Sequence, residues 1–160
     1  MTYIKRDSIG RLSFILFAFY LAQWISPLKW YELIDLQKND DDFKFWSGLV
    51  LILLFSSQWI LTYVRVILQK QGKAFYKTLR IHKLTGAFSP VVYFVHSADP
   101  DYGFLLILTT VFLLNQLVAS INLDRLTIRQ YNVWTALHIF FSSSLMVLAI
   151  SHIVLIFQYK

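Results

Sequence analysis

Long apolar runs separated by short charged stretches make up most of this 160-residue chain. Five runs reach or approach the roughly 20 residues with which a helix crosses the apolar core of a bilayer. They lie at residues 12–26, 45–68, 81–96, 103–121 and 133–157. The second, fourth and fifth are long and apolar enough by themselves, whereas the first and third are marginal. The pattern predicts an all-α protein, an integral membrane bundle of five transmembrane helices.

The third run is the most polar of the five, since it contains Lys83, Gly86, Pro90 and two histidines. Polar residues inside a span are expected where the helix faces protein or a cofactor instead of lipid. Pro90 predicts a kink, and its neighbours are expected to absorb the lost hydrogen bond. The third run is therefore the first place to look for functional residues.

Composition supports the membrane assignment and limits what else the chain can contain. Hydrophobic residues make up 57% and charged residues 15%, against about 45–50% and about 25% in soluble domains. No stretch is left for a soluble catalytic domain of about 50 residues or more, so residues 1–160 are expected to form a single transmembrane domain. The net charge of +6 could suggest nucleic acid, but the basic residues flank apolar runs, and no nucleic-acid partner is predicted.

The connecting segments predict the orientation in the membrane. Basic residues gather before residue 12, at 65–83 and at 125–129, whereas 27–44 is acid-rich and 97–102 has no basic residue. Basic segments stay on the cytoplasmic side, which predicts an N-terminus inside and a C-terminus outside. The membrane is expected to be a bacterial inner membrane. The first run has no A-x-A-like cleavage site after it and is expected to stay as a helix. The acid-rich segment is expected to be a solvated outer loop.

All four histidines of the chain lie in the third and fifth runs: His82 and His96 in the third, His138 and His152 in the fifth. Each pair is 14 positions apart, which in a helix amounts to about 21 Å along the axis and about 40° of rotation. The two runs cross in the same direction. If they lie side by side, His82 faces His138 near the inner surface and His96 faces His152 near the outer one. The spacing predicts two stacked bis-imidazole sites.

Two imidazoles per level suit haem iron, because the porphyrin fills the other four positions. A zinc or copper ion would be short of donors. The chain has no cysteine, which excludes disulfides, Cys-held iron–sulfur clusters and c-type haem. The predicted cofactors are two haems b, with Gly86 leaving room for a macrocycle one turn from His82. Histidines that only stabilise a non-haem bundle are the alternative.

The residues around these ligands resemble a known family. "LRIHKLTGAF" followed by "FVH", and "IRQYNVWTALH" followed by "SH", are similar to the ferric reductase-like transmembrane domain. That group includes NADPH oxidases, metalloreductases and the haem subunit of bacterial methionine sulfoxide reductase. The resemblance implies that His82 and His138 bind an inner haem and that His96 and His152 bind an outer one. Lys83 and Gly86 match the residues that follow the first ligand.

The chain departs from the family after the fifth run. The family normally has a sixth span, and its oxidases and metalloreductases continue into a flavin- and nucleotide-binding domain, whereas this chain ends at Lys160 and is interpreted as truncated before the sixth helix. Cytochrome b of quinol–cytochrome c reductases shares the histidine spacing, but the contexts "IHKLTG" and "YNVWTALH" favour the first family.

The resemblance implies an electron-transfer subunit with no catalytic residue of its own. Electrons would pass from a separate donor inside, a flavoprotein or a quinol, to a protein or small-molecule acceptor outside. Arg80 and Lys83 are candidates for binding the inner-haem propionates, or they follow from the positive-inside rule. Asn115 and Gln116 predict hydrogen bonds between helices or a quinone contact. A quinol-oxidising subunit and a non-haem scaffold or assembly subunit stay as alternatives.

Overall fold

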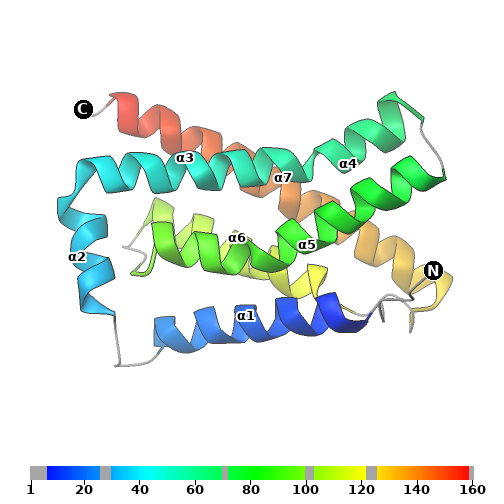
Figure 1. Cartoon of the computed structure of the whole chain (residues 1–160), viewed down its shortest axis with the longest axis horizontal. Helices are drawn as coiled ribbons and strands as arrows, with labels where there is room; N and C mark the ends of the chain where they lie inside the picture. The colour runs from blue at the N-terminus through cyan, green and yellow to red at the C-terminus, as the bar shows by residue number, and fades with distance from the viewer. Residues whose placement is uncertain (1–6, 26–29, 70–71, 100–102, 122–125, 159–160) are drawn as a thin grey trace. The chain divides into compact units, whose positions relative to one another are not determined.

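The computed structural model describes residues 7–25, 30–69, 72–99, 103–121 and 126–158, and all regular elements in these ranges are helices (Figure 1). The all-α prediction is confirmed. The chain divides into two compact units, Met1–Asp99 (unit 1) and Pro100–Lys160 (unit 2). The elements of unit 1 are α1 (Asp7–Ile25), α2 (Tyr31–Asn39), α3 (Asp41–Gln58), α4 (Ile60–Thr62), the π-helical turn η1 (Tyr63–Ile67) and α5 (Lys73–His96). Unit 2 pairs α6 (Phe104–Ala119) with α7 (Ile128–Gln158).

Helix α5 is the central helix of unit 1, because both α1 and α3 pack against it (Figure 1). It begins well before the apolar run at 81–96, since the polar residues in front of that run, such as Lys77 and Arg80, are good helix formers. Hydropathy marks only the apolar part of a helix. The predicted run at 81–96 therefore lies wholly within α5, but the helix begins earlier than the run, at Lys73.

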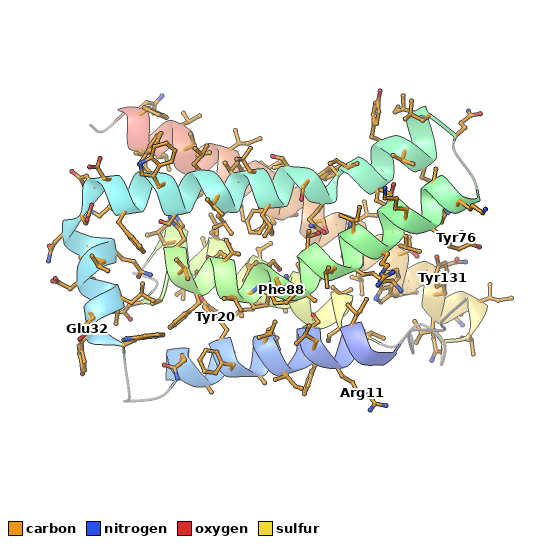
Figure 2. The ribbon with its side chains drawn as sticks, in the orientation of Figure 1. Arg11, Tyr20, Glu32, Tyr76, Phe88 and Tyr131 are labelled. Carbon is orange, nitrogen blue, oxygen red and sulfur yellow. The ribbon has the colours of Figure 1, made fainter. Side chains whose placement is uncertain are left out.

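Aromatic side chains join α1 to α5. Tyr20 of α1 lies between the two helices (Figure 2) and is 1% exposed, and Tyr93 of α5 is 2% exposed. Their rings meet edge to face, with centroids 5.7 Å apart and planes at 89°, a preferred geometry for aromatic pairs. The Tyr20 hydroxyl donates to the carbonyl of Ser97 at 3.4 Å. The end of α1 therefore meets the end of α5, and the two helices run in the same direction.

The acid-rich segment predicted as an outer loop contains helix α2, so that prediction is wrong in part. None of the α2 side chains is buried, and a helix of nine residues is too short to give a clear apolar run. Gln37 fixes it in place: the side-chain amide donates to the carbonyls of Phe94 and Val95 at 3.1 and 2.7 Å and accepts from the Ala98 amide at 2.9 Å. The last carbonyls of a helix have no partner within it, so Gln37 completes the end of α5.

The run of aspartates after α2 starts the next helix. Asp40 is the N-cap of α3, and its side chain accepts from the amide of Phe43 at 2.9 Å, as a good N-cap residue does. Asp41 and Asp42 lie in the first turn of α3, where the helix dipole favours negative charge. This part of the predicted loop is a helix start.

Helix α5 continues through Pro90. Proline has no backbone N–H, so it cannot bond the carbonyl four residues earlier, that of Gly86. The hydroxyl of Ser89 donates to the Gly86 carbonyl at 2.7 Å. The neighbour of Pro90 thus absorbs the lost hydrogen bond, as the sequence predicts.

Two helical stretches of the described residues are long and apolar enough to cross a membrane, by length and composition alone: Asp41–Arg65 and Ile128–Gln158. They correspond to the second and fifth apolar runs. The apolar parts of α1 and α6 are shorter, and α5 has the required length but contains more charge. The structure therefore supports a membrane protein with two such helices. The five-span arrangement stays a prediction.

Charge separates along unit 1. Basic residues gather where α5 begins, among them Lys73, Lys77 and Arg80, and acidic residues gather where α3 begins. In Figure 2, Arg11 and Tyr76 lie towards one end of unit 1, and Glu32 lies at the other. At the acidic end Lys38 forms an ion pair with Asp99 at 3.6 Å. Unit 1 therefore has a basic end and an acidic end.

Candidate functional site

The structure places each pair of histidines on one helix. His82 and His96 belong to α5, and His138 and His152 belong to α7. All four are partly buried. Fourteen residues of continuous helix separate the members of each pair by about 21 Å, as the sequence predicts. Because α5 and α7 belong to different units, the facing of the two pairs stays a prediction.

His82 is held by the end of α3. Its Nδ1 lies 3.2 Å from the backbone carbonyl of Gln58, and a carbonyl can only accept, so Nδ1 carries the proton. The α-helix is interrupted at Trp59, which follows Gln58 and whose amide bonds to the carbonyls of Ser56 and Ser57. The carbonyls at a helix end are available to side chains. The interruption therefore supplies the acceptor that fixes the tautomer of His82, in which Nε2 is the nitrogen with the lone pair.

The side chain of Gln58 contacts the next turn of α5. Its amide donates to the hydroxyl of Thr85 at 2.6 Å, and a Cβ added to Gly86 would lie 3.5 Å from Gln58 Oε1. The residue expected to face a macrocycle thus lies beside Gln58, at an ordinary contact distance. Of the two candidate propionate ligands, Arg80 is exposed and Lys83 is partly buried next to His82.

His96 is held by the start of α3. Its Nδ1 lies 3.0 Å from Ser47 Oγ. The Ser47 hydroxyl also lies 3.3 Å from the carbonyl of Lys44 and can donate to it. In that arrangement the hydroxyl accepts from His96, and Nδ1 carries the proton, as in His82. A Cβ added to Gly48 would lie 3.0 Å from His96 Cε1, a distance too short for an undisturbed ring. A side chain at position 48 would require this imidazole to move by a few tenths of an ångström.

Sequence reasoning missed all three residues of α3 that hold these imidazoles, namely Ser47, Gly48 and Gln58. Small residues within an apolar span mark places where helices approach closely, and "WSG" in the second run is such a pair. Gln58 is a polar residue deep in the same run. Both features can be read from the sequence, but the sequence does not show which helix these residues contact.

Aromatic rings of unit 2 flank both histidines of α7. Trp134 stacks on His138 with centroids 5.2 Å apart and planes at 13°, and its indole N–H donates to the Val118 carbonyl of α6 at 2.7 Å. Phe104 stacks on His152 at 6.3 Å and 14°. These contacts fix the planes of both imidazoles within unit 2.

A polar bond and an apolar hollow lie between α6 and α7. The hydroxyl of Ser142 donates to Asn115 Oδ1 at 3.0 Å, so the predicted interhelical hydrogen bond of Asn115 is confirmed, and Gln116 is buried. At the end of α6 and the start of α7 is a hollow of about 270 Å³, lined by apolar side chains with Arg129 and Gln130. The other basic residue of this segment, Arg125, lies outside the described residues.

The donors suit a haem better than a bare metal ion. Within the described ranges, no three histidine or carboxylate side chains form a group that could hold a metal ion. Haem b needs only two protein ligands. A metal-binding histidine usually donates its other N–H to a carbonyl, carboxylate or water. Nδ1 of His82 and Nδ1 of His96 each lie at hydrogen-bond distance from an oxygen of α3. The residues therefore fit axial ligation through Nε2.

Comparisons with protein-family models, with curated proteins and with solved structures find no match for this chain. The resemblance to the ferric reductase-like domain stays a prediction from the residues that carry it. The function is inferred from the chain's own side chains.

Proposed function

We propose that this chain is a cytochrome b subunit with five membrane spans and two bis-histidine haems, which passes single electrons from the inner to the outer side of a bacterial inner membrane. The observation that carries the proposal is the hydrogen bonding of the α5 histidines. Nδ1 of each lies within hydrogen-bond distance of an oxygen of α3, and the two contacts are about 21 Å apart on one helix. With Nδ1 as the donor in both, the ligating atom in this proposal is Nε2.

The four histidines have distinct roles in this proposal. His82 with His138 ligates the inner haem, and His96 with His152 ligates the outer haem, as the sequence spacing predicts. Bound haem b supplies an iron that cycles between the ferric and ferrous states. Because histidine fills both axial positions, no position is open for a substrate. The chain is therefore a conduit that needs a separate donor inside and a separate acceptor outside.

The charge pattern of unit 1 supports the direction. Its basic end, with Lys73, Lys77 and Arg80, corresponds to the cytoplasmic side under the positive-inside rule. That end holds His82, and the acidic end holds His96. The N-terminus is then inside, and the acidic end faces the acceptor.

An absorption spectrum of the purified protein tests the proposal. Bis-histidine haem b is expected to give sharp bands on reduction, at two haems per chain. Alanine variants of the four histidines are expected to fall into two classes. His96→Ala and His152→Ala lose the outer haem, and His82→Ala and His138→Ala lose the inner one. A His96→Ala protein with two haems would show that the ligand assignment is wrong.

A membrane scaffold without haem is the second candidate. The bonds from His82 and His96 to α3 would also stabilise a bundle that binds no cofactor. In that case the purified protein shows no haem band, even after expression with added haem precursor. His82→Ala then lowers the unfolding temperature of the apo-protein and has no spectral effect.

A third candidate is a quinol-oxidising subunit, in which a quinol is the inner electron donor. The hollow beside Arg129 favours this candidate. Its apolar lining and single cation suit an apolar ring with polar oxygens. Reduction of the haems by menadiol, in the absence of any flavoprotein, would support this candidate. Leu137→Trp, which fills the hollow, is expected to slow that reduction and to leave reduction by dithionite unchanged.

A further inference from the structure

We propose that Ser47 sets the reduction potential of the outer site through its hydrogen bond to His96, whereas the backbone sets that of the inner site. The inference rests on the proposed function, because it concerns the haem that His96 would ligate. It assigns a positioning role to a residue that the sequence did not single out. Its consequence is that one side chain of α3 adjusts the outer site alone.

The two α5 histidines have chemically different acceptors. His82 donates to a peptide carbonyl, that of Gln58, at 3.2 Å. The partner of His96 Nδ1 is a hydroxyl, that of Ser47, at 3.0 Å. A substitution can remove the hydroxyl, but no substitution removes the carbonyl. The outer imidazole is therefore the adjustable one.

The acceptor on Nδ1–H controls the electron density at Nε2. A strong acceptor makes the imidazole more basic, which stabilises ferric iron over ferrous iron and lowers the potential. A peptide carbonyl is a stronger acceptor than an aliphatic hydroxyl. The hydrogen bonds to α3 thus lower the reduction potential of the inner haem more than that of the outer haem. This difference favours electron flow outwards.

The surroundings of Ser47 offer its hydrogen an acceptor other than His96. The Lys44 carbonyl lies 3.3 Å from Ser47 Oγ, and donation to it turns a lone pair of the hydroxyl towards Nδ1. Gly48, the next residue, holds the ring close, since an added Cβ would lie 3.0 Å from Cε1. The imidazole is placed by contact on one side and oriented by the hydroxyl.

The test is a redox titration of the haem-loaded protein followed by absorbance. The wave that is missing in His96→Ala identifies the outer site. Ser47→Ala removes the acceptor and is expected to shift that wave to higher potential while the other wave stays in place. Ser47→Thr keeps a hydroxyl and is expected to restore the wild-type position. Ser57→Ala is the matched control, because Ser57 makes the same bond to the carbonyl three residues earlier, that of Leu54.

Several outcomes of this titration would contradict the role of Ser47. An outer wave that Ser47→Ala leaves in place or lowers, or a shift confined to the inner wave, overturns the inference and leaves the proposed function standing. If Ser47→Ala loses the outer haem, Ser47→Asn gives the sign, since its amide carbonyl is a stronger acceptor and is expected to lower the potential. An outer wave that does not move down in Ser47→Asn overturns the inference as well. A wild-type protein without haem overturns the proposed function and this inference together.

Discussion

At the scale of single residues, the two glycines beside the α5 histidines differ in how much space they have. A methyl group at Gly48 would lie 3.0 Å from the His96 ring, whereas one at Gly86 would lie 3.5 Å from the Gln58 side chain. The first distance requires the ring to move, and the second is an ordinary contact. Substitutions at the two positions are therefore expected to have different consequences.

Gly48→Ala is expected to reduce the binding of the outer haem and to spare the inner one. The methyl group pushes the His96 imidazole away from Ser47, and overpacking of this kind costs roughly 1–3 kcal/mol. Since about 1.4 kcal/mol is a factor of ten, the outer site is expected to lose roughly 5- to 150-fold in haem affinity. Haem content measured from the reduced spectrum checks this. Ser56→Ala, an exposed change on the same helix, serves as control, and full outer-haem content in Gly48→Ala would contradict the prediction.

Gly86→Leu is expected to lower the inner-haem content. The large side chain pushes Gln58 away from Thr85 and disturbs the turn that carries His82, again at roughly 1–3 kcal/mol. The helix itself stays intact, because leucine is a better helix former than glycine. Gly86→Ala is the size control and is expected to keep both haems. An unchanged spectrum in Gly86→Leu would show that this face of α5 can accept a large side chain.

At the scale of elements, α5 owes its continuity through Pro90 to one hydroxyl. Proline leaves the Gly86 carbonyl without its usual donor, and Ser89 donates to it at 2.7 Å. Ser89 is 2% exposed, so water does not readily replace it. The bond joins the part of α5 with His82 to the part with His96.

A double-mutant cycle tests this coupling. Ser89→Ala is expected to lower the free energy of unfolding by roughly 1–3 kcal/mol, the cost of a buried polar group that loses its partner. In a Pro90→Ala background the new backbone N–H bonds the Gly86 carbonyl, so the same change is expected to cost less. Denaturation in detergent micelles measures both. Strictly additive effects would show that Ser89 and Pro90 do not share that carbonyl.

At the scale of the whole molecule, the separation of charge in unit 1 predicts the orientation in the membrane. The chain has no cysteine, so single cysteines can be labelled without background. Asp42→Cys and Asp101→Cys are expected to react with an impermeant thiol reagent added outside intact cells, whereas Lys73→Cys is expected to react only after the cells are opened. The reverse pattern would invert the proposed direction of electron transfer.

The sequence by itself determined where the main helices lie and which of them carry the histidines. Apolar runs, helix propensity and a spacing of 14 residues are local properties, and they placed His82 with His96 and His138 with His152 on single helices before any packing was known. Asn115 was correctly predicted to bond across helices, because a polar side chain deep in an apolar run has few other partners.

Only the tertiary structure decided what holds each imidazole of α5. The contact of Ser47 and Gly48 with His96, and of Gln58 with His82, depends on the rotation of α3 and on the interruption at Trp59. These residues are 24 to 49 positions apart in the chain, and no local pattern encodes which face of one helix meets another. The same holds for α2, whose Gln37 side chain acquires its role only where α5 ends. Helix formation is settled within a few turns of chain, whereas the partner of a buried nitrogen is settled by packing between distant segments.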